Sequence, residues 1–168
     1  WKENNTQIEP GWVCASDAAI RYCLDPRNFL SDENIFQFDT TKYNPSVHTD
    51  AAVTGTLAGT PMGEGDKRDK YQYQKTGNWL NVGCTYAQLI VEKGREKNVS
   101  PVHLASRIRQ ETGGDLYNNR SIYGIYPGLE GFYNFFNIKA SGSNPVYAGL
   151  THAKSNGWSN PNVSIQAG

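Results

Sequence analysis

One carboxylate in this sequence stands where a carboxylic acid could do chemistry. Ser100 and Pro101 mark the start of a helix, since serine caps the first free N–H groups and proline needs none at the first position. At about 100° per residue, Leu104, Ile108 and Glu111 share one face of that helix. Desolvation on an apolar face and the negative end of the helix dipole both favour the protonated form of the Glu111 carboxyl. Glu111 is therefore placed as a general acid would be.

A neighbouring arginine favours a different interpretation. Arg107 lies four residues before Glu111 and could pair with it, which would favour the charged carboxylate. Glu111 would then be an ordinary solvated residue at a helix end. The helical pattern by itself leaves both interpretations open.

Length, charge and composition narrow the function classes. The chain has 168 residues, with 16 basic and 16 acidic side chains, so its net charge is zero. The length predicts a single domain over 1–168, and we expect a monomer with no nucleic-acid partner. No apolar run approaches the ~20 residues of a membrane span, so we expect no membrane insertion. The 4 Trp, 10 Tyr and 6 Phe suit a carbohydrate groove as well as a small core.

Capping signals and apolar spacing predict a mainly α (α+β) chain. Residues 1–62 are expected to be helical after an irregular start at 1–15, and residues 63–84 to form an exposed loop. The strand-forming residues 122–126 predict a small β-rich or irregular lobe over 115–140. After a break at Pro161, the tail is expected to begin an element that continues past Gly168. Helices are predicted to start at Ser16, Ser31, Thr49, Thr85, Ser100 and Asn144.

The cysteines show no metal or redox spacing. Cys14, Cys23 and Cys84 form no CxxC pair, and the chain has no cluster of His and Asp ligands. We expect buried thiols, no metal and no cofactor. A disulfide between Cys14 and Cys23 remains an open alternative that nothing in the sequence supports.

Several motifs in order resemble one enzyme family. The stretch VSPVHLASRIRQETG at 99–113 resembles the catalytic-helix motif of bacterial endo-β-N-acetylglucosaminidases, glycoside hydrolase family 73. YNFFNI at 133–138 is similar to the second motif of that family, and 148–158 to its third. The segments at 25–30, 35–38 and 59–62 are similar to the N-terminal extension of clostridial and related Gram-positive autolysins.

This resemblance covers almost the whole chain and implies a lysozyme-like fold. Such a fold is a helical bundle with a small β-rich lobe after the catalytic helix and a closing helix within 85–168. It also implies a secreted enzyme that acts in the cell wall. The implied reaction cleaves the β-1,4 bond after N-acetylglucosamine in peptidoglycan glycan strands, without metal or cofactor. Glu111 matches the general acid of the family.

The second catalytic group is left open. Some family members have a second Glu beyond the Asn-Phe-Phe motif, whereas residues 139–144 contain no acid here. Glu130 is one candidate for it, with a role as an exposed turn residue as the alternative. Alternatively the 2-acetamido oxygen of the substrate attacks the anomeric carbon, with Tyr133 orienting it. Sugar contacts are expected from Tyr126, Asn134, Phe135 and Tyr147.

Two other functions compete with this one. A muramidase or lytic transglycosylase of the same fold would cut on the other side of the disaccharide and would also place a catalytic Glu at such a helix end. A non-catalytic module that binds the cell wall would keep the groove without turnover.

Overall fold

The computed structural model divides the chain into two compact units, residues 1–40 and residues 41–168, and each is described by itself. The prediction of a single domain over 1–168 stays a prediction. The described residues are 2–9, 12–32, 34, 40–60, 62–63, 71–73, 79–81, 83–112 and 119–168.

The first unit begins with a hairpin where the sequence predicts an irregular segment, so that prediction is wrong. Strands β1 (Lys2–Glu9) and β2 (Trp12–Ala15) pair antiparallel with irregular register. Helix α1 (Asp17–Leu24) follows, and the Ser16 hydroxyl accepts a hydrogen bond from the Ala19 N–H at 3.2 Å. The helix predicted after Ser16 is confirmed, because this cap satisfies an N–H that the helix itself cannot.

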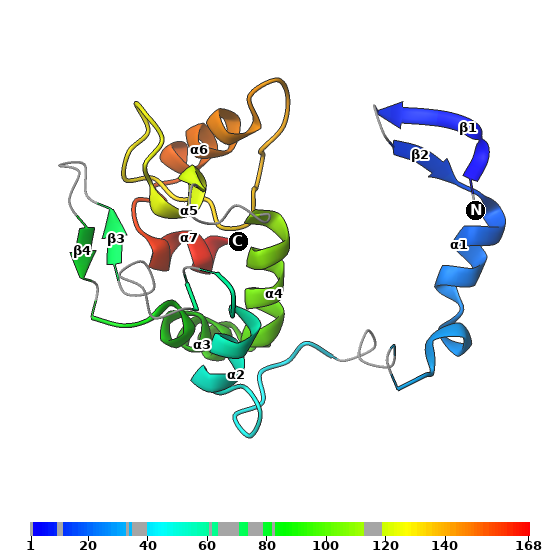
Figure 1. Cartoon of the computed structure of the whole chain (residues 1–168), viewed down its shortest axis with the longest axis horizontal. Coiled ribbons are helices and arrows are strands. Elements are labelled where there is room, and N and C mark those ends of the chain that lie inside the picture. The colour runs from blue at the N-terminus through cyan, green and yellow to red at the C-terminus, as the bar shows by residue number, and fades with distance from the viewer. Residues whose placement is uncertain are drawn as a thin grey trace. The chain divides into compact units, whose positions relative to one another are not determined.

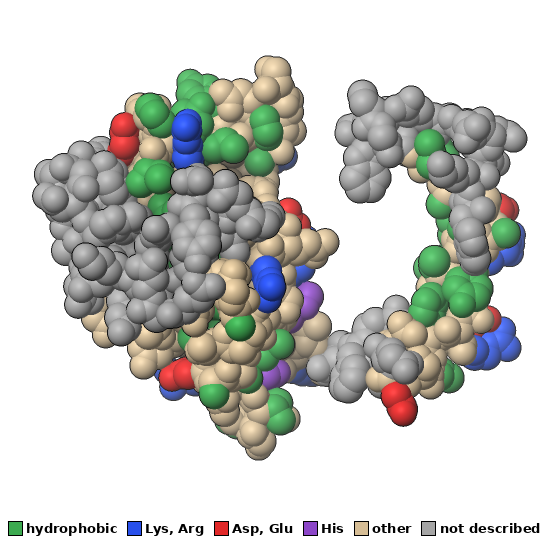
Figure 2. Space-filling model, viewed as in Figure 1, with side chains coloured by type: hydrophobic (Ala, Val, Ile, Leu, Met, Phe, Trp, Pro, Cys, Tyr) green, Lys and Arg blue, Asp and Glu red, His purple; other side chains and the backbone are tan. Residues whose placement is uncertain are grey.

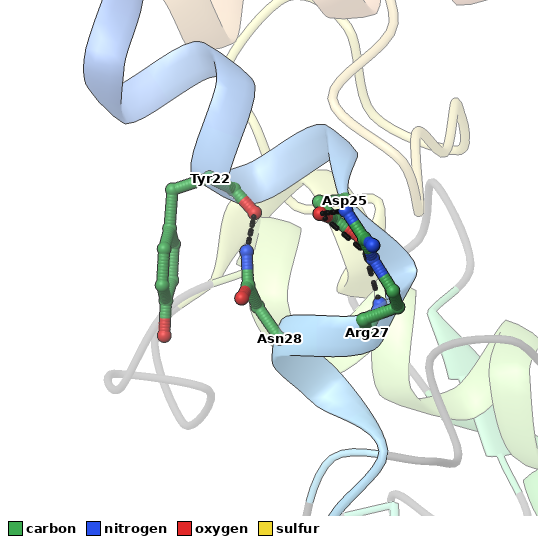
Figure 3. A network of polar contacts seen from close by, with 4 residues as sticks. All are labelled: Tyr22, Asp25, Arg27 and Asn28. Carbon is green, nitrogen blue, oxygen red and sulfur yellow. Dashed lines mark hydrogen bonds and ion pairs between the residues drawn. The ribbon is translucent and has the colours of Figure 1, made fainter.

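A short polar network turns the chain after α1 (Figure 3). The Asp25 carboxylate accepts from the Arg27 backbone N–H at 3.0 Å and from the Arg27 guanidinium at 2.5–3.1 Å, at the start of the 3-10 helix η1 (Pro26–Phe29). The Asn28 amide donates to the Tyr22 carbonyl at 2.8 Å. The hydrogen bond from Arg27 lowers the pKa of the exposed Asp25 carboxyl. The helix predicted from Ser31 lies largely outside the described residues.

Three helices of the second unit pack against one another: α2 (Asp50–Thr56), α3 (Tyr86–Lys97) and α4 (Pro101–Thr112) (Figure 1). Their predicted starts are confirmed. Thr49 caps α2, and Thr85 forms a reciprocal capping box with Gln88 at the start of α3.

The segment predicted as an exposed loop over 63–84 contains a second hairpin. Strands β3 (Tyr71–Tyr73) and β4 (Trp79–Asn81) pair antiparallel, with Gln72 opposite Leu80. The prediction is therefore wrong for these two strands. The charged run at 64–70 lies outside the described residues.

The lobe predicted at 115–140 as β-rich or irregular is irregular after a short helix over its described part, so the β-rich alternative is wrong. No strand occurs in residues 119–140, and the residues expected to be extended start instead with helix α5 (Arg120–Tyr123). Asn119 caps α5, and Gly124 ends it with a φ of 62°. Because this turn places Ile122 and Tyr123 in the core, burial outweighs the strand preference of these residues.

Two further helices complete the second unit. Helix α6 (Pro145–Ser155) begins at the predicted Asn144 cap. The break expected at Asn160-Pro161 is instead the start of helix α7 (Pro161–Ala167), with Pro161 in its first turn. The sequence prediction missed α7, whose Ile165 reaches the core and packs near α3.

The fold is mainly α, as predicted. The core of the second unit joins α2, α3, α4, α5, α7 and the segment before α6. Its fully buried side chains include Val53, Leu57, Ile90, Ala105, Ile108, Ile122 and Phe135.

Surface features of the described residues add three points. No described helix is long and apolar enough to cross a membrane. Acidic and basic side chains are scattered on the face drawn in Figure 2 and form no continuous patch of one sign there. The expectation of buried thiols is wrong, since Cys23 is exposed and Cys14 and Cys84 are half-buried; all three are free.

Candidate functional site

Glu111 lies in the wall of a cavity of about 510 Å³ at the C-terminal end of α4. Its side chain is 27% exposed, so the carboxyl can reach a molecule that enters the cavity. The wall also includes residues from the start of α5, the turn after it and the start of α6. Its described members are Glu111, Thr112, Asn119, Arg120, Ser121, Tyr126, Asn137, Asn144 and Val146.

The start of α4 is held by a buried histidine. The Ser100 hydroxyl oxygen accepts from the His103 N–H at 3.2 Å and lies 3.1 Å from His48 Nε2. The Asn44 N–H donates to His48 Nδ1 at 2.8 Å. A neutral imidazole that accepts at Nδ1 carries its proton on Nε2, so His48 donates to Ser100. This network ties α4 to the segment before α2.

Two asparagines hold the other end of α4. The last carbonyls of a helix have no partner within it. Asn137 donates to the Glu111 carbonyl, and Asn119 donates to the Thr112 carbonyl at 2.8 Å. The backbone at Glu111 is thus positioned by residues that themselves line the cavity.

The Glu111 carboxylate also forms the ion pair anticipated in the sequence. Arg107 Nη2 lies 2.6 Å from Glu111 Oε1, and Arg107 Nη1 donates to Gln110 at 2.9 Å. Glu111 is therefore paired along the helix and also lines the cavity, and its role as a general acid stays a prediction.

Tyrosine and asparagine side chains form another part of the wall. The Asn144 amide donates to the Tyr126 hydroxyl at 3.0 Å, while its oxygen caps α6 by accepting from the Tyr147 N–H at 3.2 Å. The Tyr126 and Tyr147 rings lie 6.2 Å apart, and the Tyr147 side chain is half exposed. Of these two predicted sugar contacts, Tyr126 lines the cavity, and Tyr147 lies beside Tyr126 without lining the cavity itself.

Three other predicted residues, Tyr133, Asn134 and Phe135, do not line the cavity and are at most 1% exposed. Burial raises the pKa of Tyr133 to about 12. Its ring lies so close to Gly124 that a Cβ there would be 2.7 Å from the Tyr133 Cζ. The Phe135 ring packs against Tyr86 at 5.8 Å.

Asn134 bonds entirely within the protein. Its amide nitrogen donates to the Ile138 and Gly149 carbonyls at 2.9 and 3.0 Å, and its oxygen accepts from the Ile138 N–H at 3.0 Å. It thus joins the segment after α5 to α6. In this structure Tyr133, Asn134 and Phe135 hold the cavity's surroundings together, and their contact with substrate stays a prediction.

Glu130, the candidate second carboxylate, lies in a turn beside the cavity residues without lining the cavity itself. The turn is closed by hydrogen bonds from Leu129 to the Tyr126 carbonyl and from Gly131 to the Gly124 carbonyl, each 2.9 Å. Glu130 is half-buried. Its catalytic role stays a prediction.

Sequence reasoning missed several cavity residues. Asn119, Arg120 and Asn137 were not predicted as site residues, and Asn144 was predicted only as a helix start. Asn119 did carry a signal, since asparagine before Arg120-Ser121 is a common helix cap. Nothing in the local pattern around Arg120 pointed to a cavity. Among the described residues, no group of three or more His, Cys, Asp or Glu side chains lies close enough to hold a metal ion.

Comparison with known proteins places this geometry in a known fold. The sequence matches no protein-family model, and no curated protein matches it. The structure is similar to the crystal structure of S. aureus glucosaminidase B, with a TM-score of 0.65 and 23% identity over 93% of this chain and 54% of that one. It is also similar to that of a major bifunctional autolysin, with a TM-score of 0.56 and 17% identity over 97% of this chain and 59% of that one.

The chain has a glucosaminidase-like fold. At these identities the likeness shows the fold alone. The chain spans between half and two thirds of the length of each of these two structures.

Proposed function

We propose that this chain is a peptidoglycan hydrolase, an endo-β-N-acetylglucosaminidase similar to glycoside hydrolase family 73 and to clostridial autolysins. It cleaves the β-1,4 bond between N-acetylglucosamine and N-acetylmuramic acid. The observation that carries the proposal is the position of Glu111, 27% exposed in a cavity wall at the end of α4 in a glucosaminidase-like fold.

Glu111 acts as the general acid. Its carboxyl donates a proton to the bridging oxygen as the bond from that oxygen to the anomeric carbon breaks. The same carboxylate forms an ion pair with the Arg107 guanidinium at 2.6 Å, which must open or rearrange when the proton is transferred.

The acetamido group of the substrate supplies the nucleophile in this proposal. Its carbonyl oxygen bonds to the anomeric carbon as the leaving group departs, and water later opens the resulting ring while Glu111 takes back a proton. Asn119, Asn137 and Asn144 in the wall each use one amide N–H within the protein, so the second N–H of each suits the carbonyl oxygen of an N-acetyl group. Glu130 acting as a second carboxylate is the alternative.

Tyr126 and Tyr147 offer ring faces and hydroxyls to the sugars. We further propose that the protein is secreted, works as a monomer in the cell wall and acts on glycan strands. This follows from the proposed substrate.

Glu111→Gln tests the catalytic role. The substitution keeps the shape of the side chain but removes the transferable proton, so we expect the rate of cell-wall clearing to fall about 100-fold or more. Glu92→Gln is the matched control, since Glu92 is exposed on α3 and outside the cavity wall. Equal rates for the wild type and Glu111→Gln, with both proteins folded by circular dichroism, would refute the proposal.

Product analysis tests which bond is cut. Purified peptidoglycan is digested, reduced with borohydride and analysed by mass spectrometry. Reduced N-acetylglucosamine at the new ends supports the proposal. Reduced N-acetylmuramic acid would indicate a muramidase, and anhydro-muramic ends a lytic transglycosylase.

Stereochemistry tests the nucleophile separately. Attack by the acetamido oxygen followed by water retains the anomeric configuration, which NMR of the first product can read. An inverted first product would exclude acetamido participation while leaving Glu111 as the acid.

A further inference from the structure

The described cavity wall carries one carboxylate and one cation. Glu111 is the acid, and Arg120 is the only Lys or Arg among the described residues that line the cavity. A neutral amino-sugar polymer would not need a guanidinium at this position, whereas a negatively charged group in the substrate would have a use for it.

Within the described part of the chain, Arg120 lacks the carboxylate partner that Arg27 and Arg107 have. Arg27 pairs with Asp25 and Arg107 pairs with Glu111. Arg120 is exposed and forms no ion pair with any carboxylate among the described residues. Its guanidinium is therefore not neutralised by the part of the protein that the structure describes.

The surroundings of Arg120 restrict where its guanidinium lies. The residue follows Asn119, whose amide bridges the end of α4 to the start of α5 through Thr112, Ser121 and Ile122. The guanidinium carbon lies 5.8 Å from the centre of the Tyr126 ring, a distance suited to a cation–π contact. Tyr126 is in turn held by Asn144 at 3.0 Å. The cation thus stands beside an anchored ring in the wall that also contains Glu111.

We propose that Arg120 binds a carboxylate of the substrate and thereby makes the site prefer muramic-acid-containing glycan to uncharged polymers of N-acetylglucosamine. The inference rests on the proposed function and specifies its substrate. The two sugars of peptidoglycan share the same ring, and muramic acid differs by its lactyl side arm. That arm carries either a free carboxylate or a stem peptide with carboxylates of its own. A guanidinium fork matches a carboxylate with two parallel N–H donors.

The kinetic test compares Arg120→Ala with the wild type on three substrates. The first is glycan stripped of stem peptides, with free lactyl carboxylates; the second is the same glycan with those carboxylates converted to neutral methyl amides; the third is peptide-bearing peptidoglycan. Arg95→Ala, an exposed change on α3 outside the cavity wall, is the matched control. The measured quantity is kcat/KM from the release of reducing ends.

We expect Arg120→Ala to lower kcat/KM on a charged substrate by roughly 10- to 100-fold, the range for a hydrogen bond to a charged group, and to change the neutral glycan little. A loss on stripped glycan assigns the lactyl carboxylate, whereas a loss on peptide-bearing material alone assigns the stem peptide. Arg120→Lys keeps the charge without the fork and should be intermediate. An equal loss on charged and neutral glycan, or no loss on either, would overturn the inference.

Binding separates this inference from the proposed function. The wild type and Arg120→Ala are titrated by isothermal calorimetry with chitobiose and with the disaccharide of N-acetylglucosamine and N-acetylmuramic acid, both without and with its stem peptide. We expect only the wild type to prefer a charged disaccharide to chitobiose, with a preference that weakens as salt rises. Preference without cleavage would refute the proposed function alone. Cleavage without a preference for either charged disaccharide would refute the role of Arg120.

Discussion

The cavity wall and the buried segment at 133–135 use the same kinds of side chain for different purposes. In the wall, Asn144 holds Tyr126 beside open space, and the neighbouring Tyr147, which does not line the cavity, is half exposed. In the buried segment, the Asn134 amide donates hydrogen bonds to backbone carbonyls, and the Tyr133 ring packs closely against Gly124. Residue type made both regions equal candidates for sugar contact. Packing separates them, because a side chain without exposed surface cannot stack on a sugar.

This comparison predicts that substitutions in the two regions fail in different ways. Changes in the buried segment should reduce stability first, and changes in the wall should reduce substrate binding or turnover with little effect on stability.

Phe135→Ala gives the largest expected effect on stability. The side chain is fully buried against Tyr86, so its removal leaves a cavity in the core. We expect a loss of about 3–5 kcal/mol in the free energy of unfolding, measured in urea. Phe135→Leu should cost less, as it fills more of the space. A loss below about 1 kcal/mol together with impaired glycan binding would mean that Phe135 contacts the sugar, as the sequence predicted.

Asn134→Ala should cause the next largest loss of stability. It leaves the Ile138 N–H and the carbonyls of Ile138 and Gly149 without their present partner. Because buried polar groups without a hydrogen-bond partner are costly, we expect a loss of about 2–4 kcal/mol in the free energy of unfolding. Asn156→Ala is the control, because its amide bonds to His152 at an exposed position. Comparable losses for both variants would contradict the structural role of Asn134.

Tyr133 predicts an alkaline loss of stability. The folded protein holds the phenol proton to a pKa of about 12, against the ordinary 10.0, because the ring is buried. The unfolded chain loses its proton first, so the free energy of unfolding stays level below pH 10 and falls between pH 10 and 12. The contribution of Tyr133 to this fall is at most about 2–3 kcal/mol.

Unfolding curves of the wild type and Tyr133→Phe from pH 8 to 12 check this prediction. The variant should fall less steeply. Tyr86 accounts for part of the remaining fall, because burial also raises the pKa of its phenol. Parallel curves for the two proteins would mean that the Tyr133 hydroxyl is open to solvent and could reach substrate.

Tyr147→Ala gives the smallest expected change and acts on the other region. Its ring is half exposed beside Tyr126, so we expect the free energy of unfolding to change by less than about 0.5 kcal/mol. Loss of one stacking face should raise KM for glycan by roughly 2- to 10-fold. Tyr147→Phe keeps the ring and should stay near the wild type. Unchanged KM in Tyr147→Ala would remove this residue from the proposed site.

Much of the helical fold could be predicted from local pattern. The caps at Ser16, Thr49, Thr85 and Asn144 start helices where expected, because a capping side chain bonds within about three residues of its own position. The strand predicted at 122–126 is wrong, because its formation does not depend on local pattern alone. The β preference of Ile122 and Tyr123 is weak, and burial in a helical turn outweighed it.

The candidate site was predictable only in part. Glu111 was identified from its place at the end of a helix and from the family resemblance, and Tyr126 as an aromatic side chain that could stack on a sugar. Arg120 and Asn137 were not predicted as site residues, and Asn144 was predicted only as a helix cap, because nothing in the local pattern around them indicates a cavity.

The sequence by itself determined where α1, α2, α3, α4 and α6 begin and which carboxylate ends α4, since both depend on neighbours a few residues away. Only the tertiary structure decided that Glu111, Arg120 and Asn144 share one cavity, and that Tyr133 and Phe135 are closed off from it. The physical reason is that exposure depends on which distant elements pack over a side chain, and no local pattern encodes that packing.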